Sequence, residues 1–258
     1  MSVPAVAVHR DAQALAEAVA ARLITRLVDV QSSGRLARIV LTGGTIADRI
    51  HHAVAVSKSC DAVDWGGVEV WWGDERFVAA DDPERNERQA RLALLDKVRL
   101  EPGHVHPMPP PDQAQGDPDI AAEMYTAELA AAAGPGDHDA IPTFDVLMLG
   151  IGPEGHVASL FPGMPALYDE RPVAGVRGCP KPPPVRVTMT MPTLQHAHDV
   201  WFVASGEEKA RAVHLALSGA GPMQVPAAGP KGMLSTWWLL DKSAASELPA
   251  GLQRVATS

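Results

Sequence analysis

The sequence predicts an α/β fold, because amphipathic helical segments alternate with short apolar runs along its 258 residues. The order strand, loop, helix recurs at least four times. Apolar residues make up 46% of the chain, which is enough to bury a large core. We therefore expect a single domain over residues 1–258, built on parallel strands.

Local patterns predict the elements in chain order. The segment 11–30 repeats apolar residues at every fourth position, which is typical of an amphipathic helix, and Gly34 closes it. Apolar runs bounded by turn residues predict strands at 38–42, 68–72, 144–149, 185–190, 200–204 and 234–240. Helical spacing or high alanine content predicts helices at 45–57, 86–98, 120–133 and 207–217. Proline clusters predict loops at 101–118 and 162–184, the second an irregular surface excursion.

Charge and cysteine content exclude several classes of protein. The net charge of −9 makes the chain a poor candidate for binding nucleic acid, so we expect no such partner. Arg10 and Asp11 interrupt the N-terminal stretch, and no run reaches the roughly 18 apolar residues of a membrane span. Cys60 and Cys179 lack the spacing of a zinc or redox motif. We expect a reduced, cytoplasmic protein, monomeric or weakly homo-oligomeric.

Three predicted strands end in polar turns that contain glycine. These turns are Leu41–Thr45, Trp71–Arg76 and Leu149–His156. A single glycine-containing turn is common after a strand and is weak evidence for a site. Because parallel strands bring their carboxyl ends to one edge of a sheet, the three turns together predict a shared crevice.

The first turn, Thr42-Gly43-Gly44-Thr45, fits an anion site. Its glycines let backbone N–H groups approach an anion closely, and the next helix adds its positive end. Thr45 is expected to cap that helix and to offer a hydroxyl. A plain strand-to-helix turn is the alternative, since short glycine motifs are not specific. Neither a Walker lysine nor a dinucleotide fingerprint is present.

The second turn carries Asp74, Glu75 and Arg76 directly after a strand. Three adjacent charges are costly to bury unless they are paired. Either the turn is solvated and Arg76 pairs with a neighbouring carboxylate, or the fork of donors on Arg76 binds an anion or oxyanion.

The third turn, Gly150-Ile-Gly-Pro-Glu-Gly-His156, is the strongest signal. Histidine titrates nearest neutrality and suits general-base work. The glycines keep space open around His156, and Glu154 is placed to orient its ring. The other histidines lack Cys or carboxylate partners at metal spacing, and no Gly-x-Ser-x-Gly nucleophile motif occurs. We expect no metal site and no serine triad.

With these turns the chain resembles the 6-phosphogluconolactonases of the glucosamine-6-phosphate isomerase/6-phosphogluconolactonase family. The matching segments are 41–45, 72–76 with Asn86, 150–162, 180–188 and 206–210. Two positions depart from the family pattern. Glu154 replaces its usual aspartate before Gly-His, and Thr45-Ile46-Ala47 replaces its usual Ser-Thr-Pro.

The resemblance implies a mainly parallel, Rossmann-like sheet flanked by helices on both faces. It also implies cofactor-free hydrolysis of 6-phospho-D-glucono-1,5-lactone to 6-phospho-D-gluconate in the oxidative pentose phosphate pathway. In that reaction His156 is the base, Glu154 orients it, and Arg76 or loop N–H groups stabilise the oxyanion. The implied substrate-binding residues are Gly43, Gly44, Thr45, Asp74, Asn86, Arg186 and Lys209. Which cation binds phosphate and which binds the carbonyl stays open.

Two alternatives remain. A glucosamine-6-phosphate deaminase has a similar histidine turn, but Ile-Ala-Phe-Asn-Glu follows it, whereas Val157-Ala-Ser-Leu-Phe-Pro162 follows here. A non-catalytic sugar-phosphate sensor would carry a DNA-binding segment, which the acidic sequence does not indicate.

Overall fold

A seven-stranded parallel sheet forms the centre of the computed structural model, which describes residues 4–249, 252 and 254–255. The strand order is β10-β1-β9-β8-β5-β2-β3. The strands are β1 (Ala5–His9), β2 (Ala37–Leu41), β3 (Val68–Trp72), β5 (Phe144–Gly150), β8 (Ala197–Ala204), β9 (Ser235–Asp241) and β10 (Arg254–Val255). The helices are α1 (Ala12–Ser32), α2 (Thr45–Val56), α3 (Asn86–Ala93), α4 (Pro118–Ala132) and α5 (Ala210–Leu217).

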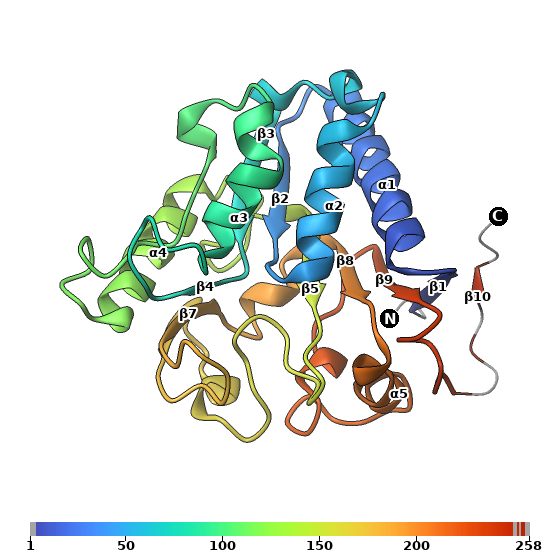
Figure 1. The fold of residues 1–258 in the computed structure, drawn as a ribbon. Coiled ribbons are helices and arrows are strands. Elements are labelled where there is room, and N and C mark those ends of the chain that lie inside the picture. The colour runs from blue at the N-terminus through green and yellow to red at the C-terminus, as the bar shows by residue number, and fades with distance from the viewer. Residues whose placement is uncertain (1–3, 250–251, 253, 256–258) are drawn as a thin grey trace.

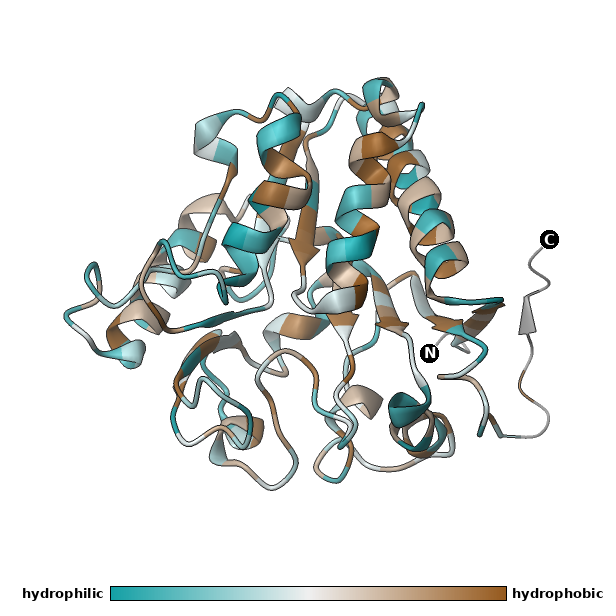
Figure 2. Cartoon of the chain, viewed as in Figure 1, coloured by the Kyte–Doolittle hydropathy of each residue, from teal (hydrophilic) through white to brown (hydrophobic). Residues whose placement is uncertain are grey.

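Helices cover both faces of this sheet because successive strand residues point to opposite sides. On β5, Val146 and Met148 join the buried cluster under α1, α2 and α3. Leu147 and Leu149 join the cluster that contains α4. The strands are accordingly apolar along their length, whereas the covering helices show one polar side (Figure 2). The predicted α/β fold, with a mainly parallel sheet flanked on both faces, is confirmed.

A second, antiparallel sheet lies beside the carboxyl ends of the main strands (Figure 1). Its order is β4-β7-β6, formed by Asp74–Arg76, Arg186–Met189 and Val173–Val176. The expectation of an irregular segment over 162–184 was therefore wrong in part. Val173 and Val176 are buried, and β6 pairs with β7, a contact that the local proline and glycine content does not reveal.

Other elements also differ from the sequence prediction. The strand β1 was not predicted, although it pairs with β9 in the main sheet. The helix expected over 86–98 ends at Ala93. Leu92, inside the helix, is 64% exposed, whereas Leu95, beyond its end, is buried, so the two do not share one side of a helix. A 3₁₀ turn, Glu207–Lys209, precedes α5 where one helix was expected over 207–217. Among the helices that the structure describes, none has the length and apolar character to cross a membrane.

Candidate active site

The three glycine-containing turns meet at the point where the strand order of the main sheet reverses. From β2 the chain moves outward to β3, and from β5 it moves the other way to β8 and β9. The backbone N–H of Gly150 donates to Oγ1 of Thr42 (3.3 Å), which joins the ends of β5 and β2. Figure 1 shows the carboxyl ends of β2, β5 and β8 directed toward β7 and α5. Open α/β sheets bind ligands at such a reversal.

A cleft made of two adjoining cavities occupies this place. The half here called the inner half, of about 250 Å³, is lined by Thr42, Asp74, Arg76 and His156 of the three turns, together with Asn86, Lys181 and Arg186. The outer half, of about 330 Å³, contains Thr45, Arg49, Ser205 and Glu208. Gly43, Gly44, Gly150, Ile151 and Lys209 line both halves. The two halves therefore share one wall and differ in the polar groups that line them.

The turn after β2 presents backbone rather than side chain to the cleft. A Cβ atom at Gly43 would collide with the side chain of Asn86, and Gly44 has a φ of +98°. Gly44, not Thr45, is the N-cap of α2, and no side chain caps the helix. The expected capping role of Thr45 is therefore wrong, because Thr45 is already the first helical residue. The uncapped N–H groups of this helix start suit an anion in the outer half.

Asp74 and Asn86 form one buried hydrogen-bonded unit in the inner half. Asn86 Nδ2 donates to the carbonyl of Asp74 (2.8 Å), and Oδ2 of Asp74 accepts from the Ser159 hydroxyl (2.6 Å). Asn86 Oδ1 is buried on the side of Gly43 and has no hydrogen-bond partner among the described residues. The unit therefore places one amide and one carboxylate in the wall of the inner half.

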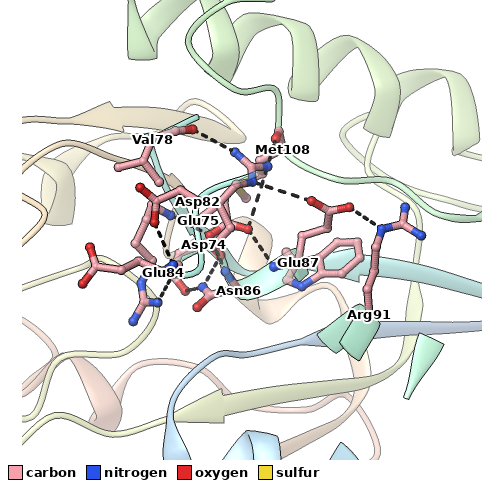
Figure 3. Close-up of polar contacts among 12 residues, drawn as sticks. Asp74, Glu75, Val78, Asp82, Glu84, Asn86, Glu87, Arg91 and Met108 are labelled. Atoms are coloured by element: carbon pink, nitrogen blue, oxygen red, sulfur yellow. Dashed lines mark hydrogen bonds and ion pairs between the residues drawn. The ribbon is translucent and has the colours of Figure 1, made fainter. Parts of the chain in front are cut away.

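Glu75 holds the backbone of Asn86 in place through its carboxylate (Figure 3). Its carboxylate accepts from the backbone N–H groups of Asn86 (2.7 Å) and Glu87 (2.9 Å), the first residues of α3. It thus caps α3 from a distant strand. Burial raises the pKa of Glu75 to about 7, although Arg85 and the N–H donors act in the opposite direction. Glu75 is 2% exposed and does not line the cleft, so its contribution is to position Asn86.

His156 and Glu154 face each other across the turn after β5. Nδ1 of His156 lies 3.1 Å from Oε1 of Glu154. A Cβ atom at Gly152 would collide with the Nδ1–Cε1 edge of the imidazole, so only glycine leaves room for this ring position. Burial lowers the pKa of His156, and Glu154 opposes that shift. The result is a mostly neutral imidazole at neutral pH, as a general base requires.

The cationic side chains of the cleft differ in how many of their N–H donors are already engaged by other described residues. The guanidinium of Arg76 donates to the carbonyl of Glu84, and no carboxylate lies within ion-pair distance of it in the described chain. Arg186 donates through Nε and Nη2 to carbonyls of residues 181–183, which leaves Nη1 on the side of Asp74, 3.8 Å from its Oδ2. Lys209 Nζ lies 3.9 Å from Glu208, and burial together with Lys181 lowers its pKa.

Comparison with known proteins bears on what this cleft is for. A family model for glucosamine-6-phosphate isomerases/6-phosphogluconolactonase matches residues 10–238. The chain belongs to this family. A 6-phosphogluconolactonase of Streptomyces coelicolor is 52% identical over 99% of this chain and 98% of its own length. A 6-phosphogluconolactonase of Mycobacterium tuberculosis is 45% identical over 93% of this chain and 96% of its own length. A solved 6-phosphogluconolactonase structure from Trypanosoma brucei has a TM-score of 0.81, with 26% identity, and covers 95% of this chain and 99% of that one.

In this family member every predicted site residue except Glu154 lines the cleft. The inner half holds Asp74, Arg76, Asn86, His156 and Arg186, and the outer half holds Thr45. Gly43, Gly44 and Lys209 line both halves. Glu154 lies behind His156, in contact with its ring nitrogen. The shared crevice that the three turns predicted is therefore present.

Sequence reasoning missed several residues of the site. Lys181 and Arg49 line the cleft, and Ser159 and Glu75 fix its acidic and amide groups. Asp241 accepts from Ser205 Oγ (2.6 Å) and from the N–H of Gly206, and so holds the turn that carries Lys209. A signal existed for Lys181, which lies in the proline-rich segment that matches the family. No group of three or more metal-ligating side chains converges within residues 4–249.

Proposed function

We propose that this chain hydrolyses 6-phospho-D-glucono-1,5-lactone to 6-phospho-D-gluconate, a step of the oxidative pentose phosphate pathway. One observation carries the proposal. A single cleft has a half-buried histidine backed by a carboxylate at one end and an uncapped helix start beside Lys209 at the other. A phosphorylated lactone has matching ends, an electrophilic carbonyl and a phosphate. Membership of the family supports the same conclusion.

The chemistry follows from the inner half. His156 takes a proton from water as the water oxygen bonds to the lactone C1, and the carbonyl electrons move onto the carbonyl oxygen. Arg76, whose guanidinium has no carboxylate partner in the described chain, is placed to stabilise that oxyanion. The C1–ring oxygen bond then breaks, and the imidazolium protonates the departing oxygen. The product is an open-chain acid, and His156 is neutral again.

The phosphate fits the outer half. The start of α2, Thr45 and Lys209 all line this half, and they offer backbone N–H groups, a hydroxyl and an ammonium. Arg49, which is exposed and has no ion-pair partner among the described residues, lines the same half. Arg186 contributes less of its donor fork to a phosphate than the sequence led us to expect, since Nε and Nη2 are already engaged.

A deaminase or isomerase reaction is less compatible with this cleft. Such a reaction moves a carbon-bound proton and needs a second free base. The other buried carboxylate of the inner half, Asp74, accepts from Ser159 at 2.6 Å and faces Arg186. Its Oδ1 accepts from Nδ2 of Asn86 (3.4 Å), so both oxygens of Asp74 already have partners. The sugar-phosphate sensor alternative makes the opposite prediction, namely binding without turnover.

The remaining expectations concern context. We infer a cytoplasmic protein, monomeric or weakly homo-oligomeric, without a nucleic-acid partner. The buried, free thiols of Cys60 and Cys179 support a reducing location. Light scattering of the purified protein tests the oligomeric state.

The test of the proposed activity is a proton-release assay with freshly generated lactone and no added metal or cofactor. Spontaneous hydrolysis is subtracted as a blank. We expect rapid turnover that falls by about 10²–10⁴-fold in His156→Asn, the usual contribution of a general base. Ammonia release from glucosamine 6-phosphate is measured in parallel. Ammonia release without lactonase activity, or binding without any turnover, would overturn the proposal.

A further inference from the structure

Residues 180–184, here called the strap, form one wall of the inner half and carry Lys181. The strap has the sequence Pro-Lys-Pro-Pro-Pro. Its carbonyls converge on one guanidinium: Arg186 Nε donates to Pro183 (3.1 Å), and Nη2 donates to Pro182 (3.1 Å) and Lys181 (3.3 Å). The N–H of Cys179 donates to the carbonyl of Pro184 (2.9 Å), which closes the base of the strap. Since proline restricts the backbone further, the strap gives Lys181 a fixed position.

From this position the Lys181 side chain reaches Glu154. Its Nζ lies 3.2 Å from Oε2 of Glu154, and Oε1 of the same carboxylate lies 3.1 Å from Nδ1 of His156. Glu154 therefore lies between Lys181 and His156, with one oxygen toward each. It accepts a hydrogen bond from Lys181, whereas its contact with Nδ1 of His156 is an ion-pair distance without hydrogen-bond geometry. The side chains of Lys181 and Glu154 are 42% and 34% exposed.

The charged groups around His156 act on its protonation in opposite directions. Glu154 and Asp74 favour the imidazolium, whereas Lys181 disfavours it. Burial raises the pKa of Glu154, but hydrogen bonding, His156 and Lys181 outweigh burial and bring it below its usual value. Arg76, Arg186 and Lys209 line the same cleft and add positive charge. A Glu154 without Lys181 would be free to turn and would pair with the imidazolium alone.

We propose that Lys181 is a positioning residue for the base, holding Glu154 against His156 so that the ring is oriented but not locked as an imidazolium. The proposal rests on the proposed function only in that the oriented base is the one that activates water. Lys181 itself touches Glu154, not the reacting carbon.

Substitution of Lys181 by Met removes the charge and keeps the length of the side chain. We expect the His156 titration to move to higher pH by about half a unit, because removal of a nearby positive charge favours the imidazolium. Glu154→Gln removes the negative charge and shifts the titration to lower pH. Lys181→Arg restores the ion pair and stays near wild type. Lys58→Met, at an exposed lysine beyond α2, is the matched control and leaves the titration unchanged.

The measurement is NMR titration of histidine-labelled protein without substrate, with the His156 signal assigned by its loss in His156→Asn. Lys181→Gln provides a second neutral variant should the Met variant fold poorly. Because no substrate is present, an upward shift without lactonase activity would reject the proposed function and keep this inference. An unchanged titration in both neutral variants, in otherwise active protein, would overturn the inference alone. In active protein we also expect kcat to fall by less than about 100-fold at neutral pH, with the acid limb of its pH profile moved upward.

Discussion

Nδ1 of His156 and Oε1 of Glu154 lie 3.1 Å apart, although glutamate replaces the family's usual aspartate at this position. The longer side chain reaches the ring because the turn folds back on itself at Gly155, which has a φ of +88°. The second carboxylate oxygen of Glu154, Oε2, accepts a hydrogen bond from Lys181 (3.2 Å).

The charge of Glu154 can be separated from its shape. Glu154→Gln keeps the shape and should lower kcat, since a neutral amide no longer stabilises the imidazolium that forms during the reaction. Glu154→Asp keeps the charge and should retain more activity than Gln. Steady-state kinetics on the phosphorylated lactone compare the three proteins. Equal kcat in Gln and wild type would mean that another group orients the ring.

The pH dependence of the reaction follows from the burial of His156. Burial lowers its pKa below the ordinary value of 6.5, so more than half of the imidazole is neutral at pH 6.5. A base must be neutral to accept a proton, so the acid limb of kcat/KM should have its midpoint below 6.5. A pH–rate profile corrected for spontaneous hydrolysis measures this midpoint. A midpoint above 6.5 would contradict the assignment.

Gly152 should tolerate no side chain. The Cβ of Gly152→Ala would occupy the place of the imidazole edge and displace the base, and a shift of about 1 Å costs about 10²-fold in rate. Gly103→Ala is the matched control, because nothing lies within 4 Å of the Cβ that it introduces. We expect kcat/KM to fall in the first variant only, with thermal unfolding checked for both. Normal activity of the Gly152 variant would show that His156 need not occupy its observed position.

The two ends of the cleft should respond to different substrates. A charge-assisted hydrogen bond to phosphate is worth roughly 1.5–3 kcal/mol, so Lys209→Ala should raise KM for the phosphorylated lactone by about 10–100-fold. It should hardly affect the slower hydrolysis of unphosphorylated gluconolactone. Arg76→Ala should impair both lactones if it serves the carbonyl, and Arg186→Ala should do so if its chief effect is to hold the strap. Equal losses on both lactones in the Lys209 variant would move Lys209 from the phosphate to the reacting carbon or the fold.

Activity should not depend on a divalent metal. The described residues contain no group of three or more His, Cys, Asp or Glu side chains placed to hold an ion. Dialysis against a chelator should therefore leave kcat/KM unchanged in metal-free buffer. Loss of activity that one particular divalent ion restores would contradict the mechanism proposed here.

The amino-acid sequence by itself determined five strands of the main sheet, β2, β3, β5, β8 and β9, and the glycine-containing turns that end β2, β3 and β5. Strand 144–149 and the turn to His156 were predicted from local signals, a buried apolar run followed by glycines. The carboxyl-edge location of the site followed as well, because parallel strands end at one edge. These features depend on neighbours in the chain, which is why apolar periodicity and turn residues reveal them.

Only the tertiary structure decided how the polar groups are shared. Arg186 was expected to bind substrate, but its Nε and Nη2 hold the strap. Glu75 caps α3 through backbone N–H groups across a loop. Ser159 reaches Asp74 from 85 positions away in the chain. Such partnerships leave no periodic trace, because a donor fork or a carboxylate satisfies whichever buried groups the fold brings near. The cost of leaving those groups unpaired is what fixes them, and that cost exists only once the chain is packed.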